Sequence, residues 1–139
     1  MSIPVWVLLG FAAWTLLMLL GSVGVYRWSR ILTKRASLSE WRADLQQGND
    51  WYQRAMRAHA NCVENLPVYA AVVVAIIATG VQSPILDTLA VILIVARVLQ
   101  TLIHISLKQT DLVAGIRFAF YFVQFICMFT MGVFVAANV

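Results

Sequence analysis

Four long apolar segments constrain this chain of 139 residues more than any other feature. They run over about 3–26, 52–79, 84–107 and 112–137, and a helix of ~20 residues is enough to cross the hydrocarbon core of a bilayer. Hydrophobic residues make up 62% of the chain and charged residues 12%, whereas a typical soluble domain has ~45–50% and ~25%. The sequence therefore predicts an integral membrane protein with a single domain over residues 1–139.

The short connections predict an all-α four-helix bundle with antiparallel neighbours. Backbone groups in lipid must be hydrogen-bonded within the segment itself, so the four segments are helices rather than strands. The second and third connections are GVQSP (80–84) and KQTD (108–111), which leave no room for a crossover. The first connection (27–50) is longer and polar, and a capping signal at Ser37 or Ser39 predicts a short interfacial helix within it.

The distribution of basic residues predicts the orientation in the membrane. The first and third connections contain six of the ten Lys and Arg residues, namely Arg27, Arg30, Lys34, Arg35, Arg42 and Lys108. The second connection and both termini contain none, so we expect both basic connections on the cytoplasmic side and both termini opposite. The net charge of +4 therefore reflects mainly the orientation in the membrane, with contact to anionic lipids as a second role. The position of the basic residues argues against a nucleic-acid partner. The sequence is compatible with a bacterial inner membrane or an endoplasmic reticulum, and its short loops favour the bacterial membrane.

Polar residues inside three of the segments fall on single helix faces. Positions i, i+3, i+4 and i+7 of a helix share a face. The second segment places Arg54, Arg57, Asn61 and Glu64 at this spacing, the third Arg97, Gln100, Thr101 and His104, and the fourth Arg117, Tyr121 and Gln124. All three stripes lie in the half of the bundle that faces the two basic connections, so we expect them to meet.

The stripes contain more positive than negative charge. Arg57, Arg97 and Arg117 accompany one deep carboxylate, Glu64. Each charge at this depth costs several kcal/mol unless it is paired or hydrated, and pairing Glu64 with Arg57 or Arg97 would offset part of that. Such a pair could serve only to fix helix register. The surplus of guanidinium groups instead predicts an anion-binding cleft that opens to the cytoplasm and has lipid as its other wall.

A metal site and a small membrane exporter find less support in the sequence. Cys62 and Cys127 have no metal-ligand spacing, so we expect two reduced, buried thiols and no metal. A small four-span exporter would need a carboxylate within the first span, and residues 3–26 contain none.

Three stretches give the chain a resemblance to a known family. RAHANCVENLP (57–67), ARVLQT (96–101) and IRFAFY (116–121) are similar to motifs of the MAPEG superfamily, the membrane-associated proteins in eicosanoid and glutathione metabolism. The number of spans and the long first connection also fit, so the resemblance covers essentially the whole chain.

The resemblance implies a homotrimer that binds glutathione as co-substrate between neighbouring subunits, with a hydrophobic second substrate. Matching positions would bind glutathione through Arg57, Asn61, Glu64, Arg97, Gln100, His104 and Tyr121. Arg117 would be the catalytic residue that stabilises the thiolate, and either Arg27 or Arg30 would match the arginine that ends the first helix in relatives.

Departures from the family pattern refine the expected activity. Gln100 stands where relatives often carry an aromatic residue or a histidine, and His104 stands where a tyrosine is common. Phe118 stands where the prostaglandin synthases carry serine. An arginine-activated thiolate, as in the leukotriene synthases, is the closer comparison. We expect a glutathione transferase or peroxidase acting on hydrophobic electrophiles or lipid hydroperoxides; the alternative is a non-catalytic membrane scaffold or lipid-binding protein. His104 could transfer a proton or be a hydrogen-bonded interfacial histidine.

Overall fold

The computed structural model describes residues 2–34 and 49–139, which form helices and their connections. The elements are α1 (Ile3–Met18), the π-helix η1 (Leu19–Gly24), α2 (Val25–Leu32), α3 (Asp50–Thr79), α4 (Pro84–Ser106) and α5 (Asp111–Ala137). Because α1, η1 and α2 are continuous, the described part contains four helices long and apolar enough to cross a membrane. The first continues to Leu32 rather than ending at Tyr26, and the predicted interfacial helix at Ser37 or Ser39 lies outside the described residues.

Polar residues at the ends of the helices explain where they begin and stop. The side chains of Asn49, Ser83 and Thr110 each accept a hydrogen bond from a backbone N–H in the first turn of α3, α4 and α5. Helix α3 ends at Gly80, whose φ of +69° is a left-handed conformation that glycine adopts without a steric penalty. The boundaries thus follow from local sequence.

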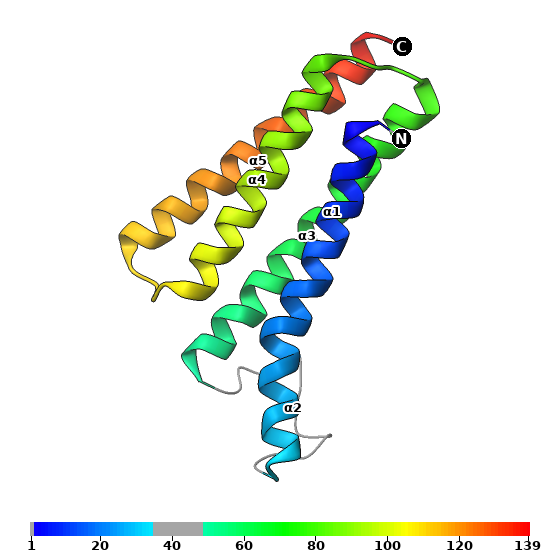
Figure 1. Cartoon of the computed structure of the whole chain (residues 1–139). Helices are drawn as coiled ribbons and strands as arrows, with labels where there is room; N and C mark the ends of the chain where they lie inside the picture. Colours follow the sequence, from blue (N-terminus) through cyan, green and yellow to red (C-terminus); the bar gives the residue numbers. More distant parts are fainter. Residues whose placement is uncertain (1, 35–48) are drawn as a thin grey trace.

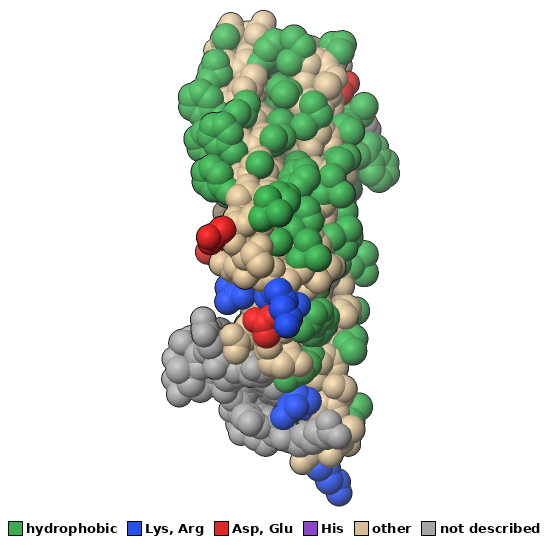
Figure 2. All heavy atoms as spheres, turned by 90° about the vertical axis from the view of Figure 1, so that its left-hand side faces the viewer, with side chains coloured by type: hydrophobic (Ala, Val, Ile, Leu, Met, Phe, Trp, Pro, Cys, Tyr) green, Lys and Arg blue, Asp and Glu red, His purple; other side chains and the backbone are tan. Residues whose placement is uncertain are grey.

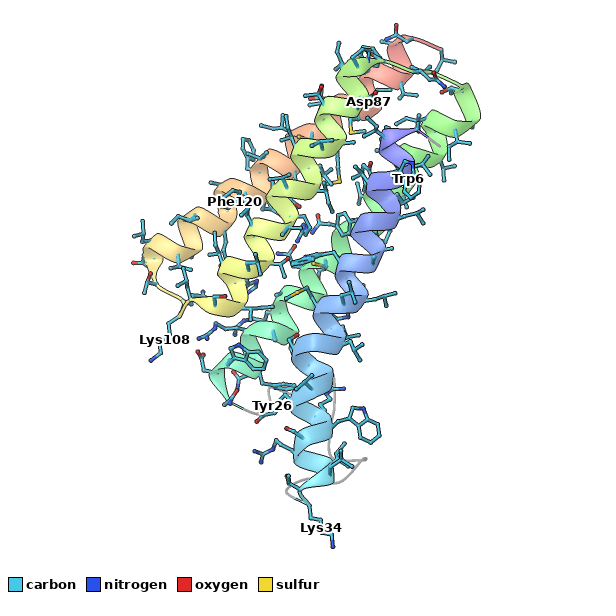
Figure 3. The ribbon with its side chains drawn as sticks, viewed as in Figure 1. Trp6, Tyr26, Lys34, Asp87, Lys108 and Phe120 are labelled. Atoms are coloured by element: carbon cyan, nitrogen blue, oxygen red, sulfur yellow. The ribbon has the colours of Figure 1, made fainter. Side chains whose placement is uncertain are left out.

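The helices form an antiparallel bundle in which α4 packs against α1, α3 and α5. Both termini and the α3–α4 connection lie at one end, and α2 and the α4–α5 connection lie toward the other (Figure 1). Lys34 and Lys108 extend from that second end, whereas Trp6 and Asp87 lie near the first (Figure 3). The described basic connections therefore share one end of the bundle; the membrane side on which that end lies stays a prediction.

One face of the bundle separates apolar from charged side chains along its length. In the view of Figure 2, hydrophobic side chains cover the upper part and lysine and arginine side chains gather below them. Many of the large apolar residues are exposed, among them Leu16, Val74 and Phe129 at more than 60%. Such a surface suits contact with lipid or with another apolar protein surface.

The interior changes character along the bundle axis. Near the termini the core is apolar, and Tyr69 on α3 stacks on Phe11 of α1 and donates a hydrogen bond of 2.7 Å to the carbonyl of Pro4. Toward the α4–α5 connection the buried residues of α4 and α5 become polar, with Arg97, Gln100, Thr101, His104 and Gln124 each at most 6% exposed. The fold thus places a polar layer inside one half of the bundle.

A pair of leucines on α4 tests this packing. Leu93 is fully buried, and truncating it to alanine leaves a cavity, so Leu93→Ala should lower the free energy of unfolding by about 2 kcal/mol or more. Leu102 on the same helix is 43% exposed, and Leu102→Ala should lose under about 1 kcal/mol because no cavity forms. Thermal unfolding in detergent measures both, and equal losses would contradict this helix orientation.

Candidate functional site

The polar stripes of α4 and α5 face each other and are joined by two side-chain contacts. Arg117 Nη1 lies 2.6 Å from His104 Nε2. About one turn away along α4 and two along α5, Gln124 Nε2 donates to Gln100 Oε1 at 2.8 Å. The structure therefore contains the predicted contact between the stripes of α4 and α5.

Helix α3 completes a small pocket against this pair. Arg97 Nη1 donates to Asn61 Oδ1 at 3.3 Å, which connects the stripe of α4 to α3. A cavity of about 210 Å³ opens beside this contact, lined by Asn61, Gln100, Ala114, Arg117, Phe118 and Tyr121. The structure thus brings together four of the predicted site residues, from three helices: Asn61, Gln100, Arg117 and Tyr121.

Hydrogen bonds behind the pocket determine how the amide of Asn61 is oriented. Its Oδ1 accepts from Arg97 and from Asn65 Nδ2, the latter at 2.7 Å. Arginine has only donors, so the atom that faces Arg97 is the oxygen of Asn61. The Nδ2 group of Asn61 is then the part of its amide that remains to serve the pocket.

The same reasoning applies to Gln100 on the neighbouring helix. Gln124 Nε2 donates to the backbone carbonyl of Phe120 at 3.0 Å as well as to Gln100 Oε1. A backbone carbonyl can only accept, so this atom of Gln124 is its nitrogen and its partner in Gln100 is the oxygen. Gln100 therefore has its N–H groups left for the pocket, which makes the wall rich in donors.

Two of the arginines have unpaired nitrogens. Arg97 is 1% exposed, its guanidinium lies 5.5 Å from the ring centroid of Phe11, and its Nη1 lies 3.9 Å from Cys62 Sγ. Its Nε and Nη2, and the Nε of Arg117, are buried with no acceptor within residues 2–34 and 49–139. Buried donors without partners are expensive, so this cluster favours an acceptor group from outside the chain.

The expected pairing of Glu64 with Arg57 or Arg97 is absent from the described residues. Arg57, Asn61 and Glu64 each precede a residue that α3 buries, so their stripe is turned by ~100° from the interior. Arg57 and Glu64 are exposed in this chain and Asn61 is half-buried. Hydrophobic periodicity does not distinguish an inward stripe from one on the flank of a buried face.

Arg54 has a role that the sequence pattern did not predict. It belongs to the same stripe, but its side chain is buried, and its Nε donates to the carbonyl of Ile105 at 3.2 Å. Its Nη1 also pairs with Asp50, the single ion pair within the described ranges. Arg54 thus ties the start of α3 to the end of α4.

The two candidate arginines at the end of the first helix differ in their contacts. Arg27 Nε donates to the hydroxyl of Tyr52 at 2.6 Å, and its guanidinium lies near the ring of the same tyrosine. Arg30 lies over the ring of Tyr26 on its own helix, 5.6 Å from the centroid. Arg27 therefore faces α3, which spacing in the sequence could not decide, and neither arginine lines the pocket at Asn61.

Cys62 has polar neighbours that its local sequence does not suggest. Both cysteines are free and buried, as predicted. The sulfur of Cys62, however, lies 3.6 Å from Thr101 Oγ1 and near Arg97, both on α4. Only the packing of α3 on α4 reveals these contacts.

Comparison with known families gives a match over most of the chain. The model of the MAPEG family matches residues 5–137, which is nearly the whole chain and includes all three helices of the pocket. The chain belongs to the MAPEG family. No curated protein and no solved structure matches it significantly. Membership associates this membrane protein in general terms with glutathione and eicosanoid metabolism, in a family that has both catalytic and non-catalytic members.

Two arginine substitutions test whether the Arg97 guanidinium is unsatisfied. In ligand-free protein, Arg97→Met should leave the unfolding temperature unchanged or raise it, because methionine fills the site beside Phe11 without buried, unpaired donors. Arg54→Met should instead cost about 1–3 kcal/mol, since Arg54 loses bonds to Ile105 and Asp50. Thermal unfolding in detergent compares the two, and an equally destabilised Arg97→Met protein would show that this guanidinium is already satisfied.

Proposed function

We propose that this MAPEG protein binds glutathione and activates its thiol for attack on hydrophobic electrophiles or lipid hydroperoxides. The observation that carries this proposal is the donor-rich pocket. Asn61, Gln100 and Arg117 line it, the oxygens of Asn61 and Gln100 are already engaged by Arg97 and Gln124, and buried nitrogens of Arg97 and Arg117 lack acceptors within the described residues. Glutathione has two carboxylates and two amide carbonyls, which are the acceptors that such a site requires.

A neighbouring subunit would complete the site. Arg57 and Glu64 are exposed on the flank of α3, and each charge near the middle of a span costs ~2.5–3.5 kcal/mol when it faces lipid. Covering this flank with a second copy, in the homotrimer that the family resemblance implies, would remove that cost. Glu64 would then bind the γ-glutamyl amine and Arg57 a carboxylate, whereas Arg97, which does not line the pocket, would support the bound peptide through its hydrogen bond to Asn61.

Arg117 is suited to stabilise the reactive sulfur. A free thiol has a pKa of ~8.5, and its thiolate is the nucleophile. A guanidinium next to the sulfur favours the anion by charge pairing. Arg117 is half-buried at the pocket wall, which Tyr121 also lines. Its guanidinium can therefore contact the sulfur of a bound glutathione while it is partly shielded from bulk water. Arg27 is the better of the two first-helix candidates for an outer contact, because it faces α3.

The second substrate would come from the bilayer along α5. Phe118 lines the pocket and starts a row of stacked, exposed rings that continues with Phe122, Phe125 and Phe129. An apolar electrophile could follow this row to the thiolate. Attack at carbon forms a thioether and expels the leaving group. Attack on a hydroperoxide forms a sulfenic acid and an alcohol, and a second glutathione then gives the disulfide and water.

The charge pattern supports an orientation for this reaction. With the end that contains Lys34 and Lys108 in the cytoplasm, the pocket would face the compartment that holds glutathione. We therefore place the long first connection in the cytoplasm and both termini opposite, in a bacterial inner membrane.

A conjugation assay tests catalysis against the scaffold alternative. Purified protein in detergent should conjugate glutathione to chlorodinitrobenzene or reduce a lipid hydroperoxide, and glutathione should raise its unfolding temperature through preferential binding to the folded state. Protein stabilised by glutathione but without turnover would support a binding role. Absence of both effects would contradict the proposal.

Two substitutions separate the proposed roles of binding and activation. Arg117→Ala should lower kcat about 100-fold or more while keeping much of the glutathione affinity, because it removes a charge that acts mainly on the thiolate. Glu64→Ala should mainly weaken glutathione binding. Asp87→Ala, at the opposite end of α4, is the control and should match the parent protein. Parent-like turnover in Arg117→Ala would remove Arg117 from this role.

A further inference from the structure

The environment of His104 gives this residue a role other than direct contact with glutathione. His104 lies on α4, 6% exposed, and is not among the residues that line the pocket. Its Nε2 lies 2.6 Å from Arg117 Nη1, and Arg117 does line the pocket. His104 therefore contacts the proposed catalytic arginine from behind.

The chemistry of arginine determines the protonation state of this histidine. A guanidinium has five N–H donors, no acceptor, and remains protonated in proteins. Arg117 must then be the donor and Nε2 the acceptor, which requires a neutral imidazole with its proton on Nδ1. A lone pair engaged in this way is not free to deprotonate a thiol.

The charged groups that act electrostatically on His104, among residues 2–34 and 49–139, are all arginines. Arg54 and Arg57 on α3, Arg97 on α4 and Arg117 on α5 act on its ring, while α1 and η1 contain no ionisable side chain. An imidazolium here would lose the bond to Arg117 and add a like charge to this group. Protonation of His104 would therefore release Arg117 rather than hold it.

We propose that His104 is a positioning residue whose neutral Nε2 anchors Arg117, so that the other N–H groups of the guanidinium point to the thiolate. This inference rests on the proposed function. It assigns to His104 the role of hydrogen-bond acceptor for Arg117. The hydrogen bond persists only while the ring is neutral. Activity should consequently fall toward acidic pH as His104 gains a proton.

Three variants test the anchor by kcat, the KM for glutathione and the pH profile. His104→Gln provides an uncharged acceptor, Oε1, close to the position of Nε2, and should keep kcat within about threefold, with a shallower acidic decline that reflects protonation of the thiol alone. His104→Leu removes the acceptor and should lower kcat about tenfold or more with little change in KM. His59→Gln, at the other histidine of the chain, should behave as the parent does. Bound glutathione should also show less thiolate absorbance in His104→Leu than in the parent.

Clear results would overturn the proposal. Parent-like kcat in His104→Leu would show that Arg117 needs no anchor, and an unchanged acidic decline in His104→Gln would show that another group titrates. Thermal unfolding establishes that each variant is folded. If the parent neither bound nor turned over glutathione, the proposed function would fail by itself. NMR of the imidazole nitrogens, with and without Arg117→Gln, would still report whether Nε2 is an unprotonated acceptor for Arg117.

Discussion

Burying guanidinium groups within membrane spans without enough carboxylates to neutralise them is the constraint on which this structure depends. Arg97 is enclosed by α1, α3 and α4, yet its contacts are an amide oxygen, a thiol and an aromatic face rather than an acid. Each of these stabilises a cation weakly compared with a carboxylate. The charge of Arg97 is therefore not neutralised by a carboxylate among the described residues, at the expense of stability when no anion is bound nearby.

Carboxamides and one imidazole extend this donor character to the rest of the pocket. Asn61 and Gln100 use their oxygens on Arg97 and Gln124, and each of these bonds is oriented by a group that can only donate or only accept. His104 similarly uses its lone pair on Arg117. These contacts occupy the acceptors of Asn61, Gln100 and His104, although the Oε1 of Gln124 stays buried without a partner among the described residues. The result is a site with a chemical preference, built from side chains that are mostly neutral.

The proposed homotrimer and the geometry of a single chain lead to the same interpretation of the outer surface. Glu64 and Arg57 are conspicuous because they are charged and exposed at a depth where lipid would surround them. Without a partner subunit, both charges would face lipid at a cost in free energy. At a contact between subunits, Glu64 would add the carboxylate that the interior lacks. The proposed trimer and the proposed glutathione site thereby depend on the same residues.

The sequence by itself determined the number of spans, most of their ends and the three polar stripes, because these follow from local hydrophobicity, capping residues and the period of a helix. It also identified Arg117, Asn61 and Gln100 as residues that would meet. Only the tertiary structure decided that Arg54 turns inward, that Glu64 stays outside, and that His104 binds Arg117. The reason is that a helical period gives angles between residues of one helix, whereas the rotation of that helix against its neighbours comes from packing.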